Sequence, residues 1–232
     1  MRKSSSGEYS YLESGLSKLR TASILYIVSS LLASIGLISV LPFITMIHAL
    51  PLHADMVALT ITKTIIVNAE ASAIAFTTMG VAITMLILSM VGGIISLIAL
   101  FAYLIPSFSD LSKYDESAFS TPYKLLKIGY LLGLILFIVA LIIIILGAVG
   151  RALTSIILGM VLIIISFILL LLGKIGLAIG MFKLRDRLAE TLFLVAGILF
   201  IIGIIVTIVD FVGWILVLVA TGSALDKLKM KT

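Results

Sequence analysis

Long uncharged apolar runs constrain this chain more than any other feature. Residues 128–146 contain no charged side chain, and apolar residues make up 62% of the 232 residues. A run of 18 or more such residues is read as a membrane span, because it covers about 30 Å of hydrocarbon. At least five such blocks are separated by short charged segments. The sequence therefore predicts an all-α, polytopic bundle of transmembrane helices.

The charge composition supports the same class of protein. Charged residues are only 12% of the chain, against about 25% in an average globular domain, which is too few to cover a water-soluble surface. The net charge of +5 comes from basic residues at the ends of apolar blocks, a pattern typical of membrane orientation. We therefore expect membrane lipids as partners and no nucleic acid.

The alternation of apolar blocks and charges predicts the segment boundaries. They are an N-terminal cytoplasmic tail at 1–20, span one at 21–47, an extracellular loop at 48–72, span two at 73–105, a cytoplasmic loop at 106–127, span three at 128–149, span four at 154–172, a cytoplasmic loop at 173–190, span five at 191–209, a short span six at 211–225 and a cytoplasmic tail at 226–232. The apolar block 191–221 would form a helix about 46 Å long, too long for one upright span. Asp210 divides this block, which favours a hairpin of two spans.

The distribution of basic residues sets the orientation. With six spans, all sixteen basic residues except Lys63 and Arg151 lie on the side of the two termini. With five spans, the C-terminal lysines would move to the opposite side. Because Lys and Arg in loops favour the cytoplasm, six spans with both termini cytoplasmic are preferred, and five remain an alternative.

Four polar residues in or beside apolar blocks are candidate site residues. Asp210 is the acidic residue well inside an apolar block, and ionisable groups at membrane depth are functional candidates; alternatively, it caps or turns the last hairpin at the outer surface. Glu70 and Lys174 stand at span ends, where an interfacial role is the simpler interpretation. Arg151 lies in a tight outer turn, where it could hold an anionic group or be a solvated turn charge.

The sequence lacks the motifs of common enzymes and metal sites. His48, His53 and Asp55 share one loop, but their spacing matches no zinc pattern. There is no phosphate-binding loop, HExxH or nucleophile elbow, and the absence of cysteine excludes thiolate sites. We expect no enzyme activity, no metal and no cofactor.

Two glycine pairs are candidates for close helix packing. Gly129 with Gly133, and Gly176 with Gly180, have the small-xxx-small spacing that lets helices approach closely. The alternative is that glycine is simply common in membrane spans.

Three segments carry a resemblance to a known family. They are GLSKLRTASILYIV at the entry to span one, GKIGLAIGMFKLRDR after span four, and DFVGWILVLVATGSAL near the C-terminus. The chain resembles a family of archaeal, Sulfolobus-like multi-pass membrane proteins known as domain of unknown function 973. The resemblance implies an archaeal plasma membrane and transfers no site residues.

These observations favour a non-enzymatic structural or accessory membrane protein. It would act by helix packing, in a homo-oligomer or as a subunit with other membrane proteins. The alternative is a channel or transporter with a path near Asp210 or Glu70.

Overall fold

The computed structural model describes residues 6–38, 80–81 and 83–230, and every element in this part of the chain is helical. The labelled helices are α1 (Ser6–Ile38), η2 (Ala99–Leu104), α4 (Ile105–Tyr114), α5 (Glu116–Val149), α6 (Leu153–Leu188), α7 (Thr191–Ile202) and α8 (Thr207–Lys229). Residues 83–98, directly before η2, are helical as well. Five helical stretches in the described residues are long and apolar enough to cross a membrane: Tyr9–Ile35, Ile83–Tyr114, Glu116–Val149, Leu153–Leu188 and Ile208–Lys229. The predicted membrane helical bundle is confirmed.

The chain forms two compact units. The first comprises Met1–Tyr26 with Ile98–Thr232, and the second comprises Ile27–Leu97. In the second unit, Ser29 Oγ donates a hydrogen bond of 2.8 Å to the Gly92 carbonyl oxygen. This hydrogen bond joins the part of α1 that belongs to this unit to the helical residues 83–98. The candidate site lies in the first unit.

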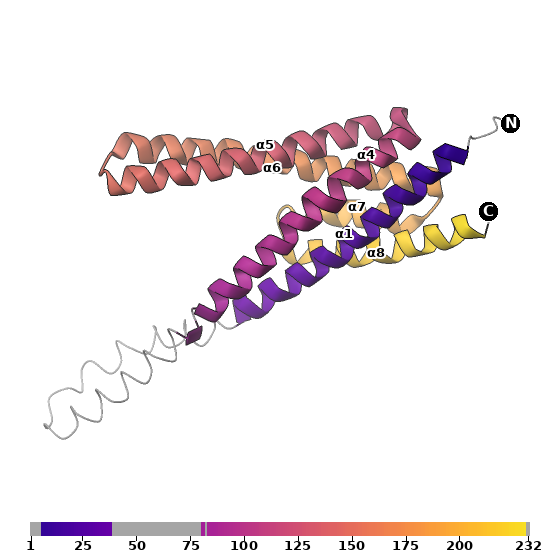
Figure 1. Ribbon diagram of the computed structural model, residues 1–232, viewed down its shortest axis with the longest axis horizontal. Helices are drawn as coiled ribbons and strands as arrows, with labels where there is room; N and C mark the ends of the chain where they lie inside the picture. The colour runs from indigo at the N-terminus through magenta and orange to yellow at the C-terminus, as the bar shows by residue number, and fades with distance from the viewer. Residues whose placement is uncertain (1–5, 39–79, 82, 231–232) are drawn as a thin grey trace, which may run out of the picture. The chain divides into compact units, whose positions relative to one another are not determined.

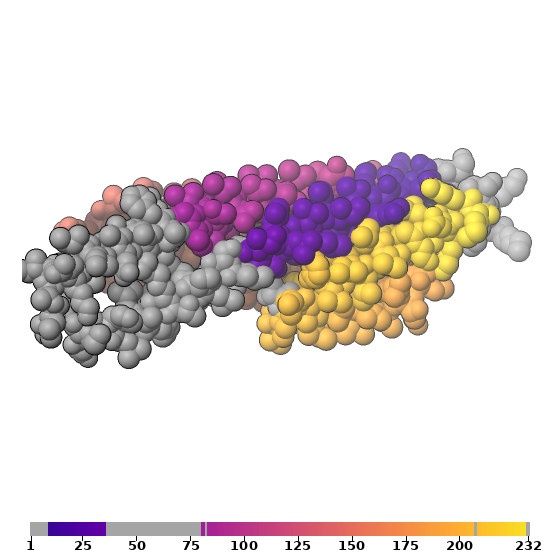
Figure 2. Space-filling view, turned by 90° about the horizontal axis from the view of Figure 1, so that it is seen from below, coloured from indigo at the N-terminus to yellow at the C-terminus, as the bar shows by residue number. Residues whose placement is uncertain are grey.

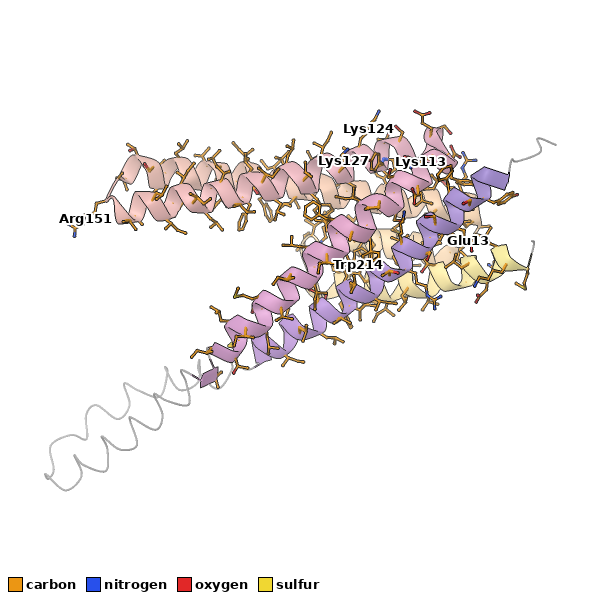
Figure 3. The ribbon with its side chains drawn as sticks, in the orientation of Figure 1. Glu13, Lys113, Lys124, Lys127, Arg151 and Trp214 are labelled. Carbon is orange, nitrogen blue, oxygen red and sulfur yellow. The ribbon has the colours of Figure 1, made fainter. Side chains whose placement is uncertain are left out.

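The first unit contains a long helical hairpin, formed by α5 and α6. The two helices lie side by side and are joined by a turn at Gly150–Ala152, with Arg151 at its tip (Figures 1 and 3). Lys124 and Lys127 lie toward the other end of this hairpin (Figure 3). Ser166 Oγ fixes the register of the two helices by donating a 2.7 Å hydrogen bond to the Gly133 carbonyl oxygen.

The predicted tail at 1–20 must be corrected, because residues from Ser6 onward belong to α1. The segment is polar in composition, but Leu12, Leu16 and Leu19 recur at helical spacing and are buried. Ser107 Oγ of α4 donates a 2.8 Å hydrogen bond to the Gly15 carbonyl oxygen, which ties this part of α1 to α4. An amphipathic helix therefore stands where a tail was expected.

The predicted cytoplasmic loops at 106–127 and 173–190 are also largely helical. Pro106 does not end its helix, because it occupies the first turn of α4, where a missing N–H is tolerated, directly after the π-helical η2. Between residues 106 and 127 the helix is interrupted only at Asp115. The Asp115 side chain caps α5 by accepting a 3.1 Å hydrogen bond from the Ala118 amide. α6 continues to Leu188 and ends where Ala189 takes a left-handed conformation.

The final apolar block forms a hairpin, but not with the predicted boundaries. α7 ends at Ile202, and the turn falls at residues 203–206 rather than at Asp210, which lies in the first turn of α8. At about 1.5 Å per residue, the 12 residues of α7 span about 18 Å, short of the roughly 30 Å of hydrocarbon. α7 is therefore too short to cross a membrane as an upright helix.

The α7–α8 hairpin is antiparallel and packs beside α1. Lys227 near the end of α8 pairs with Glu190 at the start of α7, with 2.5 Å between Nζ and Oε2. The ring of Tyr26 in α1 stacks on Trp214 in α8 at 4.3 Å between centroids, and α8 runs along the N-terminal part of α1 (Figure 2). The hairpin thus returns the C-terminal lysines to the end of α6 that carries Arg185 and Arg187.

Candidate functional site

An ion pair joins the middle of α6 to the start of α8. The Lys174 ammonium contacts the Asp210 carboxylate through Oδ2 and also donates a 3.0 Å hydrogen bond to the Gly203 carbonyl oxygen. We call these three residues the clasp. It connects the turn between α7 and α8 to one point on α6 and brings together two of the residues singled out in the sequence.

The clasp lies well inside the length of α6. At about 1.5 Å per residue, Lys174 is about 32 Å from Leu153 at the start of α6 and about 21 Å from Leu188 at its end. The α7–α8 hairpin therefore runs alongside only the charged half of α6. The remaining part, an apolar arm formed by residues 131–149 of α5 and 153–173 of α6, is about as long as hydrocarbon is thick.

The second oxygen of Asp210 has no hydrogen-bond partner. Asp210 Oδ1 is buried without a donor, although the side chains of Lys174 and Asp210 are each 21% exposed. A Cβ atom at Gly203 would overlap Oδ1. Only glycine therefore allows the turn to approach the carboxylate this closely, and the unpaired oxygen faces the Gly203 backbone.

Aromatic residues surround the clasp. Trp214 lies one turn beyond Asp210, is 6% exposed, and packs against Phe200 at 4.9 Å between centroids as well as against Tyr26. Tyr130 of α5 lies within electrostatic range of Asp210, and its ring packs against Gly173, next to Lys174. The clasp is thus a small charged centre in an otherwise apolar and aromatic environment.

Comparison with known proteins assigns the family. The family described as "Protein of unknown function (DUF973)" matches residues 13–232. The chain belongs to this family. The resemblance noted in the sequence is thereby confirmed, and with the five apolar helices it makes the chain an integral membrane protein. Neither a curated protein nor a solved structure matches the chain.

The other predicted polar candidates do not join the clasp. Arg151 lies in the turn between α5 and α6, at the far tip of the arm, with a left-handed φ of 53° (Figure 3). Glu70, His48, His53 and Asp55 lie outside the described residues. Within the part of the chain that the structure describes, no three His, Cys, Asp or Glu side chains gather closely enough to hold a metal ion.

All four predicted packing glycines of this DUF973 chain face other helices of the same unit. Gly129 lies against the backbone of Gly173, and a Cβ atom at Gly133 would be 3.0 Å from the Leu170 side chain. A Cβ atom at Gly176 would lie 2.8 Å from the Leu126 amide nitrogen, and one at Gly180 would overlap the ring of Phe108. These glycines allow close approach within the chain, so their faces are already occupied.

Three ion pairs at the charged end of this unit were not foreseen from the sequence. They are Lys18–Asp110 at 2.5 Å, Arg187–Asp115, and Lys227–Glu190 at 2.5 Å. Partial burial opposes ionisation of Asp115, but hydrogen bonds from Ser117 and Ala118 and the charge of Arg187 outweigh it and lower the pKa of this carboxyl. Residues far apart in sequence meet here, so local spacing gave no indication of the pairs.

Glu190 should make the folded protein sensitive to acid. The hydrogen bond from Lys227, opposed by slight burial, and the charge of Lys227 lower the pKa of Glu190. Its stabilisation is therefore present at neutral pH and is lost as the pH falls below the ordinary range of about 4.3. We expect Glu190→Gln to reduce the loss of melting temperature between pH 5 and pH 3, with a neutral-pH cost below about 1 kcal/mol because Lys227 is largely exposed.

The matched control for this prediction is Asp226→Asn, which changes an exposed carboxylate of α8 one residue before Lys227. It should leave the acid sensitivity as in the wild type. An equal reduction in both variants would show that the effect comes from net charge and not from the pair with Lys227.

Proposed function

We propose that this chain is a non-enzymatic membrane protein with a structural or accessory role, acting by helix packing in a homo-oligomer or as a subunit of a larger complex of the cell membrane. The observation that carries this proposal is the apolar arm of α5 and α6. Large side chains are exposed on both helices of the arm, including Ile145 at 60% and Ile164 at 61%. Such a surface is suited to contact with lipid tails and with neighbouring apolar helices.

The pairing of charged groups within the chain supports the same role. In the described part of the membrane-spanning region, Lys174 and Asp210 are paired with each other. At the charged end, Asp110, Asp115 and Glu190 each accept a hydrogen bond or ion pair from within the chain. Charged groups that hold helices together serve assembly of the bundle, and this favours a packing role over a reaction.

Cysteine cross-linking in membranes tests the proposal. The chain contains no cysteine, so Ile145→Cys and Ile164→Cys each supply one defined thiol on the exposed surface of the arm. We expect a maleimide–benzophenone label attached to these thiols to link the variants, on illumination, to a second copy or to another membrane protein. Ala140→Cys is the matched control, because Ala140 is 0% exposed and its carbonyl oxygen faces Gly159 of α6. Exposed positions that cross-link no more than this control would contradict the proposal.

One observation favours a second function, a channel or transporter with a path near Asp210. Asp210 has an unpartnered oxygen beside a break between helices, and broken helices with polar groups at membrane depth are common in transporters. Ion or solute flux into liposomes that is lost in Asp210→Asn would support this candidate. Equal flux through wild type and variant would eliminate it.

A further inference from the structure

The turn between α7 and α8 is held to α6 by a single cation. Lys174 donates to the Gly203 carbonyl oxygen at 3.0 Å and pairs with Asp210 Oδ2. The turn amides are bonded within the turn: Gly203 donates to Leu199 and Val206 to Ile202. Attachment of the turn to α6 by polar contacts therefore depends on the charge of Asp210 and the position of Lys174.

The unpaired oxygen of Asp210 can accept only a very small ligand. Oδ1 is buried and lies so close to Gly203 that even a methyl group on this glycine would overlap it. A metal ion or an organic ligand needs several further donor atoms, which this contact excludes. A proton needs only the lone pair that Oδ1 leaves unused.

Few charges compete with Lys174 for Asp210. From α5 the facing titratable group is Tyr130, and from α1 it is Tyr26, which interacts with Tyr130 and stacks on Trp214. α7 carries no titratable residue between Thr191 and Ile202. Among the described residues, Lys174 is thus the cation that holds the Asp210 carboxylate.

Protonation would remove the charge attraction that keeps the clasp closed. A neutral acid no longer attracts the Lys174 ammonium by charge, and a lysine at the end of an apolar segment can then extend toward water or headgroups. Loss of this attraction favours separation of the turn from Lys174.

We propose that Asp210 is a proton-binding site, and that protonation at Oδ1 opens the clasp and releases the α7–α8 turn from α6. The proton comes from water, to which the Asp210 side chain is partly exposed, and no other bond is made or broken. The proposal rests on the geometry of the clasp and requires neither oligomerisation nor transport.

The chain carries its own reporter for this change. Trp214, labelled in Figure 3, is the only tryptophan. It lies one helical turn after Asp210 and is packed between Tyr26 and Phe200. Movement of the start of α8 would alter both ring contacts. The emission of Trp214 therefore reports on the clasp without any added label.

The test is a pH titration of Trp214 emission, from pH 9 to pH 4, on the full chain in phosphatidylcholine nanodiscs. We expect one reversible transition that fits a single proton. Asp210→Asn should show the low-pH spectrum at every pH, whereas Asp110→Asn should keep the transition, because Asp110 pairs with Lys18 and Ser14 and not with the clasp.

A second variant keeps the test decisive if Asp210→Asn fails to fold. In Lys174→Met the cation that holds the turn is gone, so the clasp cannot form and Trp214 should show the low-pH spectrum at every pH. Absence of a wild-type transition, a transition that persists in Asp210→Asn, or a transition that persists in Lys174→Met would each overturn the proposal.

Discussion

Replacing Gly129 by alanine should destabilise the bundle by about 2–3 kcal/mol, the upper part of the range of about 1–3 kcal/mol that is typical for overpacking. The added Cβ atom would overlap the backbone of Gly173 and lie 2.7 Å from the Leu169 carbonyl oxygen. A backbone cannot rotate away as a flexible side chain can, so α5 and α6 must separate. Unfolding by sodium dodecyl sulfate in mixed micelles, followed by circular dichroism, measures the loss.

Gly222→Ala is the control for this substitution. Gly222 also lies within a helix, α8, but a Cβ atom there would meet nothing within 4 Å. Alanine is favoured over glycine in a helix by up to about 1 kcal/mol, so this variant should be neutral or slightly stabilised. Similar losses in both variants would show that α5 and α6 are not packed at Gly129.

Removing Lys174 should have the second large effect. At pH 8, Lys174→Met leaves the Asp210 carboxylate without its cation. Breaking a fully buried pair costs about 3–5 kcal/mol, and the partial exposure of both side chains reduces the expected loss to about 2–3 kcal/mol. The same unfolding measurement applies.

The double variant Lys174→Met with Asp210→Asn completes a thermodynamic cycle. Because the unpaired charge is removed, most of the stability lost in Lys174→Met should return. Strict additivity of the two single losses would contradict an ion pair between these residues.

The long apolar helices could be predicted from the sequence because hydropathy alone marks them. Residues 128–149 and 154–172 were predicted as spans, and they lie within α5 and α6. The sequence predicts loops at the charged ends of these helices, because charge indicates the end of a span. Helices continue beyond hydrocarbon, and Asp115 and Ala189 mark the actual breaks.

The start of α1 illustrates a second limit. The segment is rich in serine and charge, so its mean hydropathy concealed the buried stripe of Leu12, Leu16 and Leu19. The spacing of these leucines by three and four residues is visible in the sequence and would have predicted an amphipathic helix.

The clasp was only partly predictable. Asp210 and Lys174 were each recognised as isolated charges beside apolar runs, and their opposite signs were the available indication of a pair. The depth at which the α7–α8 turn meets α6 depends on helix packing that brings together two residues 36 positions apart in the sequence. Spacing along the sequence does not predict how α8 aligns with α6. The sequence therefore predicts the break between the last two helices at Asp210, whereas the chain turns at Gly203.

The packing glycines were also only partly predictable from the sequence. Small-xxx-small spacing identified Gly129, Gly133, Gly176 and Gly180 as positions of close approach, but it does not name the partner helix. The structure gives them partners within the chain, which are α6 for Gly129 and Gly133, α5 for Gly176 and α4 for Gly180. The assembly with other chains that we propose would therefore use another surface, such as the outer face of the arm.

The mass of the protein extracted from its own membrane, without detergent, in polymer-bounded lipid discs tests the proposed packing role most directly. The chain alone has a mass of 24.8 kDa. Native mass spectrometry of particles released from these discs should give a multiple of this mass, or this mass together with that of another membrane protein. A single chain accompanied only by lipid, at the expression level of the native cell, would contradict the account.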